Sequence, residues 1–142
     1  MLALVLSAVY RRWGVLALTV IAIALADFAA TALKAIVDRP RPFLRYPDTN
    51  VLVPRPHDGS FPSGHAATSF AAATILSFAF PKATPAFLVV AAAVAFSRVY
   101  VGVHYPLDVI GGAVLGALVA AGLWSLIHRR RRALTANPEA GR

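Results

Sequence analysis

Two histidines, His65 and His104, lie where a polar segment of the sequence gives way to a long apolar one. Asp108 follows His104 by four residues, a spacing that brings side chains to one face of a helix. The carboxylate of Asp108 is therefore expected to hold the His104 imidazole in one tautomer. A single histidine at such a boundary is more often structural than catalytic, but a second one at an equivalent boundary favours chemistry.

A segment that favours phosphate binding precedes the first histidine. Ser63 and Gly64 stand where a loop becomes a helix, so backbone N–H groups can turn inward at the positive end of the helix dipole. Alone, a Ser-Gly pair at a helix start is more often a simple cap. The pair becomes a candidate phosphate site only together with the other polar segments.

Three cations, Lys34, Arg41 and Arg98, stand at or near the ends of other apolar segments. A zinc site would need three or four N, O or S ligands with little positive charge nearby. Converging cations would repel a metal ion, whereas they would stabilise the oxygens of a phosphoryl group. The polar residues therefore predict an anion site without a metal ion.

The elements that must position these residues are long apolar segments. The chain has 142 residues, of which 58% are hydrophobic and 14% charged, against about 25% charged in soluble domains. This composition predicts a membrane protein of one domain. The net charge of +8 does not indicate nucleic-acid binding, because the basic residues cluster at the ends of apolar segments. The chain has no cysteine, which excludes a disulfide framework and a thiolate nucleophile.

The expected fold is all-α, a polytopic membrane bundle of about four spans. The spans are expected at 13–33, 65–80 (short for a span), 85–103 and 107–127. A proline-rich segment between the first two is expected to be an extended loop at the membrane surface. The expected domain covers residues 1–132, and a disordered cytoplasmic tail is expected over 133–142.

Small and polar residues indicate how the spans face one another. Asp27, Thr31 and Lys34 share one helical face, which should look into the bundle rather than towards lipid. Asp27 is interpreted as a structural partner more readily than as a functional group. Gly112 and Gly116 lie on one face of the last span and favour close approach of a neighbouring helix.

The orientation follows from the positive residues near the ends of the spans. Arg11-Arg12, Lys82 and Arg129–Arg132 fall on one side, which should be the cytoplasm. All polar segments then fall on the opposite side, where six basic residues run against the topology rule. A bound anion would account for them: Lys34, Arg39, Arg41, Arg45, Arg55 and Arg98.

The polar segments together resemble the three signature motifs of the type 2 phosphatidic acid phosphatase (PAP2) superfamily. The motifs occur in order between residues 34 and 108, at the spacing within each motif that is typical of the family. They are Lys34, six residues, then Arg41-Pro42; Pro62-Ser63-Gly64-His65; and Ser97-Arg98, five residues, His104, three residues, Asp108.

The resemblance implies a PAP2/haloperoxidase-like helical core and hydrolysis of a phosphate ester or anhydride without a metal ion or other cofactor. It implies that His104 is the nucleophile that forms a phosphohistidine and that Asp108 orients it. His65 would be the general acid for the leaving group and would then help to activate water. The phosphoryl oxygens would be held by Lys34, Arg41, Ser63, Gly64 and Arg98.

The chain departs from the resemblance at its start. Membrane members of the family usually have about six spans, with two before the first motif. Here one full span and a short apolar stretch precede Lys34. The sequence is thus expected to be either truncated or misassigned at its N-terminus, or a reduced version of the fold.

The predicted function is a lipid phosphatase in the cell membrane, with its site on the extracytoplasmic face. A polyprenyl diphosphate is favoured, because Arg39, Arg45 and Arg55 could hold a second phosphate. The alternatives are a phosphatidylglycerophosphate or phosphatidate phosphatase, a vanadate-dependent haloperoxidase-like protein and a non-catalytic membrane fragment. The expected partners are the lipid phosphate and the bilayer, and a homo-oligomer remains open.

Overall fold

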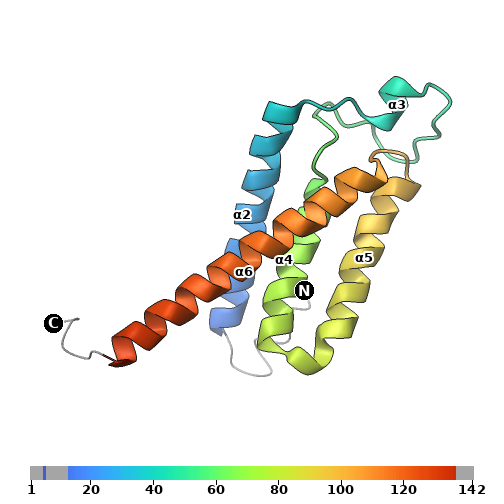
Figure 1. Cartoon of the computed structure of the whole chain (residues 1–142). Coiled ribbons are helices and arrows are strands. Elements are labelled where there is room, and N and C mark those ends of the chain that lie inside the picture. The colour runs from blue at the N-terminus through green and yellow to red at the C-terminus, as the bar shows by residue number, and fades with distance from the viewer. Residues whose placement is uncertain (1–4, 6–12, 137–142) are drawn as a thin grey trace.

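The computed structural model describes residue 5 and residues 13–136, with side chains as far as residue 129. The described residues form helices and their connections, with no strand among them. Four long helices run alternately in opposite directions and lie side by side (Figure 1). In chain order the elements are α2 (Trp13–Val37), α3 (Pro42–Arg45), α4 (Gly64–Ala79), the 3-10 turn η1 (Pro81–Ala83), α5 (Thr84–Tyr100) and α6 (Pro106–Ala136).

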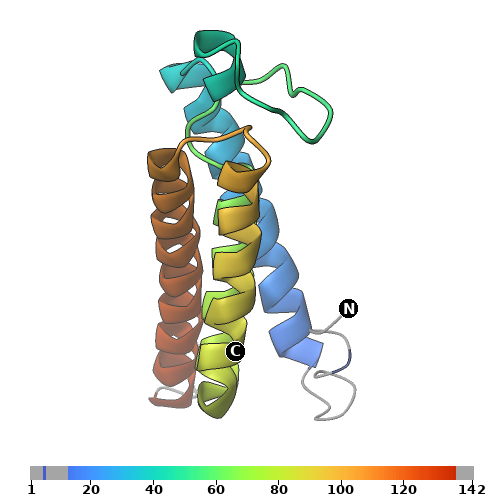
Figure 2. The ribbon, with the colours of Figure 1, turned by 90° about the vertical axis from the view of Figure 1, so that its right-hand side faces the viewer.

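Helix α4 is the centre of the bundle, because it packs against α2, α5 and α6. Figure 2 shows α6 and α2 on either side of the α4–α5 pair. The buried side chains between these helices are mostly alanines at intervals of four residues, which lets the backbones approach closely. They include Ala22, Ala26 and Ala30 of α2 and Ala67 and Ala71 of α4.

Helices α4 and α6 pack closely against each other, and this contact depends on two glycines. A Cβ added at Gly112 would overlap the carbonyl oxygen of Ser63, and one at Gly116 would overlap that of Ala67. The predicted close approach of a helix at these glycines is therefore confirmed, and α4 is the helix that approaches.

Large apolar side chains point outwards from the bundle. Phe28 of α2 is 74% exposed and Leu118 of α6 is 67% exposed, whereas most of the buried core residues are alanines. A surface of this kind is suited to a lipid environment rather than to water. Three helical segments are long and apolar enough to cross a membrane: Trp13–Arg45, Pro81–Tyr100 and Pro106–Arg129. The chain is therefore an all-helical membrane protein, as expected.

The boundaries of the elements refine the expected spans. Helix α4, with 16 residues, corresponds to the segment expected to be short for a span, and it is not among the three segments long enough to cross a membrane. It lies instead among three neighbouring helices. The proline-rich segment is not wholly extended, because Pro42 begins the short helix α3, where proline is favoured. Helix α6 continues to Ala136, four residues into the expected tail, while residues 137–142 lie outside the described residues. The apolar stretch at the start also lies outside them, apart from Val5.

The alternating directions of the helices bring all three polar segments to one end of the bundle. The C-terminal ends of α2 and α5 and the N-terminal ends of α4 and α6 meet there, below α3 (Figure 1). Turn η1, which contains Lys82, and the C-terminal part of α6, which contains Arg129, lie at the other end. Arg11 and Arg12 lie outside the described residues.

Candidate active site

His104 lies in the five-residue connection between α5 and α6, and it is only 5% exposed. The connection turns sharply at Gly102, whose φ of +76° favours glycine. A Cβ there would also lie 2.7 Å from the carbonyl oxygen of Asn50 in the long loop. The turn therefore packs under the loop and holds the imidazole inside the protein rather than at its surface.

The two ring nitrogens of His104 face different groups. Nδ1 lies 3.6 Å from Oδ2 of Asp108, and Nε2 lies 3.4 Å from Nη1 of Arg41. The Nδ1 distance exceeds that of a direct hydrogen bond, but Nδ1 has no other partner among the described side chains and backbone groups. The carboxylate thus favours a proton on Nδ1 and leaves Nε2, on the cationic side, with its lone pair.

Asp108 is fully buried in the first turn of α6. Its Oδ1 accepts a hydrogen bond of 2.7 Å from Nη1 of Arg39. Its Oδ2 accepts one of 2.5 Å from the hydroxyl of Ser60 and one of 2.9 Å from the backbone N–H of Tyr105. These donors, with the positive end of the helix dipole, compensate for burying a carboxylate.

Arg41 links the long loop to the turn that carries His104. It is 2% exposed, and its Nη1 donates a hydrogen bond of 2.8 Å to the carbonyl of Val103. Its Nε and Nη2 donate to the backbone carbonyl and the carboxylate of Asp58, at 2.9 and 2.7 Å. A buried arginine with this set of acceptors is held in one position beside the imidazole.

Asp58 connects the two cations of the first motif, since its other carboxylate oxygen pairs with Nζ of Lys34. Burial raises the pKa of Asp58, but the hydrogen bonds and positive charge of Lys34 and Arg41 outweigh burial and lower the pKa to about 2. The carboxylate is therefore ionised throughout the neutral range, and any phosphoryl group that binds both cations must compete with it.

A cavity of about 560 Å³, here called the polar cavity, brings the predicted site residues together. The two histidines His65 and His104 line it with the three cations Lys34, Arg41 and Arg98. These five residues come from three segments that are far apart in the sequence. The other lining residues are Asp27, Ala30, Thr31, Val53, Pro54, Pro56, Asp58, Gly64, Thr68 and Val103.

The predicted polar face of the first span is confirmed, because Asp27, Thr31 and Lys34 all line the polar cavity. Gly64 lines it as well, at the start of α4. Ser63 occupies the N-cap position without making a side-chain cap, and its backbone N–H donates to the carbonyl of Asp108 at 2.9 Å. Its buried hydroxyl has no hydrogen-bond partner within the described part of the chain.

The other three arginines of the loop are not among the residues that line the polar cavity. Arg39 binds Asp108, Arg55 lies over the Phe43 ring at 5.4 Å, and Arg45 is exposed. Sequence reasoning missed Asp58 and Ser60. Both lie in a stretch whose Asp, Gly and Ser are typical of turns, so no local signal indicates their contacts.

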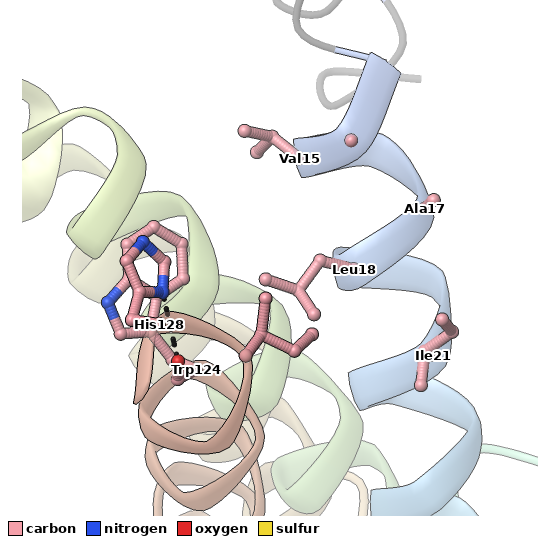
Figure 3. Close-up of a pocket in the computed structure, with 8 residues that line it drawn as sticks. Val15, Ala17, Leu18, Ile21, Trp124 and His128 are labelled. Carbon is pink, nitrogen blue, oxygen red and sulfur yellow. Dashed lines mark hydrogen bonds between the residues drawn. The ribbon is translucent and has the colours of Figure 1, made fainter. Parts of the chain in front are cut away.

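A second cavity, of about 500 Å³, lies at the other end of the bundle between α2 and α6 and is here called the apolar cavity. Val15 and Leu18 of α2 and Trp124 and His128 of α6 line it (Figure 3). Nδ1 of His128 donates a 2.9 Å hydrogen bond to the carbonyl of Trp124, and the two rings stack with centroids 4.1 Å apart. No lysine, arginine or carboxylate is among its lining residues in the described chain.

Comparison with known sequences gives one family and many relatives. The family model of the PAP2 superfamily matches residues 15–132. The bacitracin transport permease protein BcrC of Bacillus licheniformis is 38% identical over 101 residues, which is 71% of this chain and 50% of that protein. An undecaprenyl-diphosphatase of Sulfolobus acidocaldarius is 37% identical over 114 residues, 79% of this chain and 55% of that protein. The chain thus spans about half the length of these relatives.

A comparison with solved structures also finds a similar protein. The crystal structure of LpxE from Aquifex aeolicus superposes with a TM-score of 0.77 and 32% sequence identity. The match covers 86% of this chain and 73% of LpxE. The helices of this chain therefore adopt an arrangement that LpxE also has.

Proposed function

Because the chain belongs to the PAP2 superfamily, we propose that it is a phosphatase that hydrolyses a phosphomonoester or diphosphate on a membrane lipid without a metal ion. One observation carries the proposal. The polar cavity collects two histidines and three cations from three separate segments of a membrane bundle. Cations around a potential nucleophile suit a phosphoryl group, on which negative charge is spread over several oxygens.

The geometry supports a two-step mechanism. In the first step Nε2 of His104 attacks phosphorus, the bond to the leaving oxygen breaks, and His65 donates a proton to that oxygen. In the second step His65 takes a proton from water, the water oxygen attacks the phosphohistidine, and inorganic phosphate leaves. Asp108 faces Nδ1 of His104 throughout and stabilises the charge that develops on the imidazole.

The cations have the complementary role of binding the phosphoryl oxygens. Lys34, Arg41 and Arg98 line the cavity that Nε2 of His104 faces, and Gly64 lies at the positive end of α4. Ser63 precedes it with a buried hydroxyl. The cations supply the charge stabilisation that a metal ion would otherwise provide.

The substrate class is supported by position and by relatives. The site lies at the ends of membrane-spanning helices, so a lipid can present its phosphate there while its chain stays in the bilayer. One relative is named an undecaprenyl-diphosphatase, which favours a polyprenyl diphosphate over phosphatidylglycerophosphate or phosphatidate. The basic residues Lys82 and Arg129 at the other end favour an extracytoplasmic site.

The proposal is tested by phosphate release from three lipids: polyprenyl diphosphate, phosphatidate and phosphatidylglycerophosphate. The purified chain should release phosphate from at least one of them, and a chelator should not change the rate. His104→Ala, purified in the same way, is the control for contaminating phosphatases. Loss of activity with the chelator would contradict the metal-independent mechanism, and no release from any lipid would contradict the function.

The side of the membrane can be tested separately, because the chain contains no cysteine. Tyr46→Cys places a thiol at the site end, where the side chain is exposed, and Lys82→Cys places one at the other end. In intact cells a membrane-impermeant maleimide should label Tyr46→Cys and not Lys82→Cys. The reverse pattern would place the site in the cytoplasm.

A further inference from the structure

We propose that Arg39 and Ser60 are positioning residues that hold the carboxylate of Asp108 against His104. This inference rests on the proposed function, in which His104 is the nucleophile. The sequence suggested instead that Arg39 would hold a second phosphate. In the structure Arg39 binds a carboxylate instead: its Nη1 lies 2.7 Å from Oδ1 of Asp108, and Arg39 does not line the polar cavity.

The two arginines of the Arg39-Pro-Arg41-Pro sequence approach His104 and Asp108 from different sides. Arg41 lies beside Nε2 of His104, in the polar cavity. Arg39 lies on the carboxylate that faces Nδ1, and its guanidinium stands 4.3 Å from the centroid of the Tyr105 ring. The ion pair and the cation–π contact together fix the Arg39 side chain, which is two-thirds buried.

Ser60 completes a closed ring of three residues. Its backbone N–H donates to the carbonyl of Arg39 at 2.8 Å, and its hydroxyl donates to Oδ2 of Asp108 at 2.5 Å. Arg39 in turn donates to Oδ1. Arg39 therefore holds one oxygen of the carboxylate and Ser60 holds the other, and Arg39 and Ser60 are themselves hydrogen-bonded to each other. The carboxylate cannot rotate without breaking one of these bonds.

The ring matters because Asp108 is fully buried and lies in contact with His104. A buried carboxylate without a charged partner is costly, and it would turn away or take up a proton. Either change would remove the group that holds the proton on Nδ1. Arg39 and Ser60 thus act on the nucleophile through Asp108, so their loss should slow turnover without weakening substrate binding.

Kinetics distinguish this role from phosphate binding. Arg39→Gln should lower kcat about 10-fold to 100-fold, as loss of a supporting partner does at other sites, with KM within about twofold of wild type. Ser60→Ala should act in the same direction, and Arg39→Lys should recover part of the rate. Arg129→Gln, at the exposed far end, is the matched control. A raised KM with unchanged kcat, or no change at all, would overturn the proposal.

A double-mutant cycle tests whether Arg39 acts through Asp108. In an Asp108→Asn background, Arg39→Gln should have no further effect on kcat, since the carboxylate that it holds is already absent. If the kcat losses of the two substitutions multiplied instead, Arg39 would act on a group other than Asp108. The unfolding midpoint of each variant is measured alongside, and rates are compared only at temperatures where every variant is folded.

A readout that needs no turnover separates this inference from the proposed function. In protein labelled with ¹⁵N on its four histidine rings, the His104 signals are assigned by their loss in His104→Asn. Arg39→Gln should shift the Nδ1 signal of His104 and leave those of His57 and His128 in place. An unchanged His104 signal would overturn the inference. If the wild type released no phosphate, the proposed function would be wrong. The shift of the His104 Nδ1 signal would still show whether Arg39 acts on His104.

Discussion

The two ends of the bundle hold cavities of similar size. His104, just before α6, lines the cavity at the site end, and His128, within α6, lines the cavity at the other end. At the site end, His104 lies between a carboxylate and an arginine. At the other end, the Nδ1 proton of His128 is bonded to a carbonyl of its own helix, and the ring stacks on Trp124. Since the cavities are of similar size, the partners of the ring nitrogens, rather than the size of the cavity, distinguish the two histidines.

The difference between the ends arises from their connections. At the site end, the loop between α2 and α4 folds back over the bundle through bonds from Arg41 to Val103 and from Ser63 to Asp108. At the other end, α4 and α5 are joined by the short turn η1, and no charged side chain is among the described residues that line the apolar cavity. The same four helices therefore enclose a charged cavity at one end and an apolar cavity at the other.

The largest expected effect separates the two histidines. His104→Ala should reduce phosphate release about 10⁴-fold or more, as removal of a covalent nucleophile does elsewhere, and should abolish the phosphohistidine trapped by rapid alkaline quenching. His128→Ala should leave turnover within about twofold, because that ring lines only the apolar cavity. Equal losses in both variants would mean that the two ends do not differ as the geometry indicates.

A smaller effect is expected from a cation of the polar cavity. Arg98→Ala should lower kcat/KM about 10²-fold to 10³-fold, because it removes one group that stabilises the charge on the phosphoryl oxygens. Arg129→Ala removes the same charge at the other end and should change kcat/KM little. Steady-state kinetics on the preferred lipid measure both. If the two variants behaved alike, the effect of Arg98 would be one of net charge alone.

The helix contact that joins the two ends gives an effect on stability. Gly116→Val should lower the free energy of unfolding by about 1–3 kcal/mol, because its side chain would overlap the backbone of Ala67. Gly122→Val, further along α6, meets open space and should cost much less. Thermal unfolding in detergent compares the two. Similar losses would show that helix propensity, rather than the α4–α6 contact, sets the cost.

The smallest effect concerns Asp58, the carboxylate on the cations of the polar cavity. Asp58→Asn should tighten inhibition by inorganic phosphate about two- to fivefold, because the competing ion pairs are partly exposed and individually weak. Asp48→Asn, in the same loop but outside the cavity lining, is the control. Weaker inhibition in Asp58→Asn would mean that Asp58 supports phosphate binding rather than competing with it.

The same variant makes a prediction about pH. Since the pKa of Asp58 is lowered from 3.8 to about 2, the stability that its ionised form contributes is complete above its ordinary pKa and lost as the pH falls towards 2. The unfolding midpoints of wild type and Asp58→Asn should therefore converge over that range. Between pH 5 and pH 9 their difference should stay constant.

The sequence alone determined the helical membrane fold and, among the residues that line the polar cavity, the two histidines and the three cations. Long apolar segments must become helices in a membrane, and an even alternation of directions brings His65, His104 and Arg98 to one end. The same logic placed Lys34 and Arg41 there. Helix boundaries were less precise, as α3 and the extent of α6 show, because they depend on local packing.

Only the tertiary structure decided which loop residues serve the site and how. Arg39 and Arg41 are chemically identical and two residues apart, yet one reaches Asp108 and the other reaches His104. Ser60 and Asp58 are typical turn residues whose partners lie far away in the sequence. Contacts of that kind depend on how an irregular loop folds back, and no periodicity in the sequence encodes the path of such a loop.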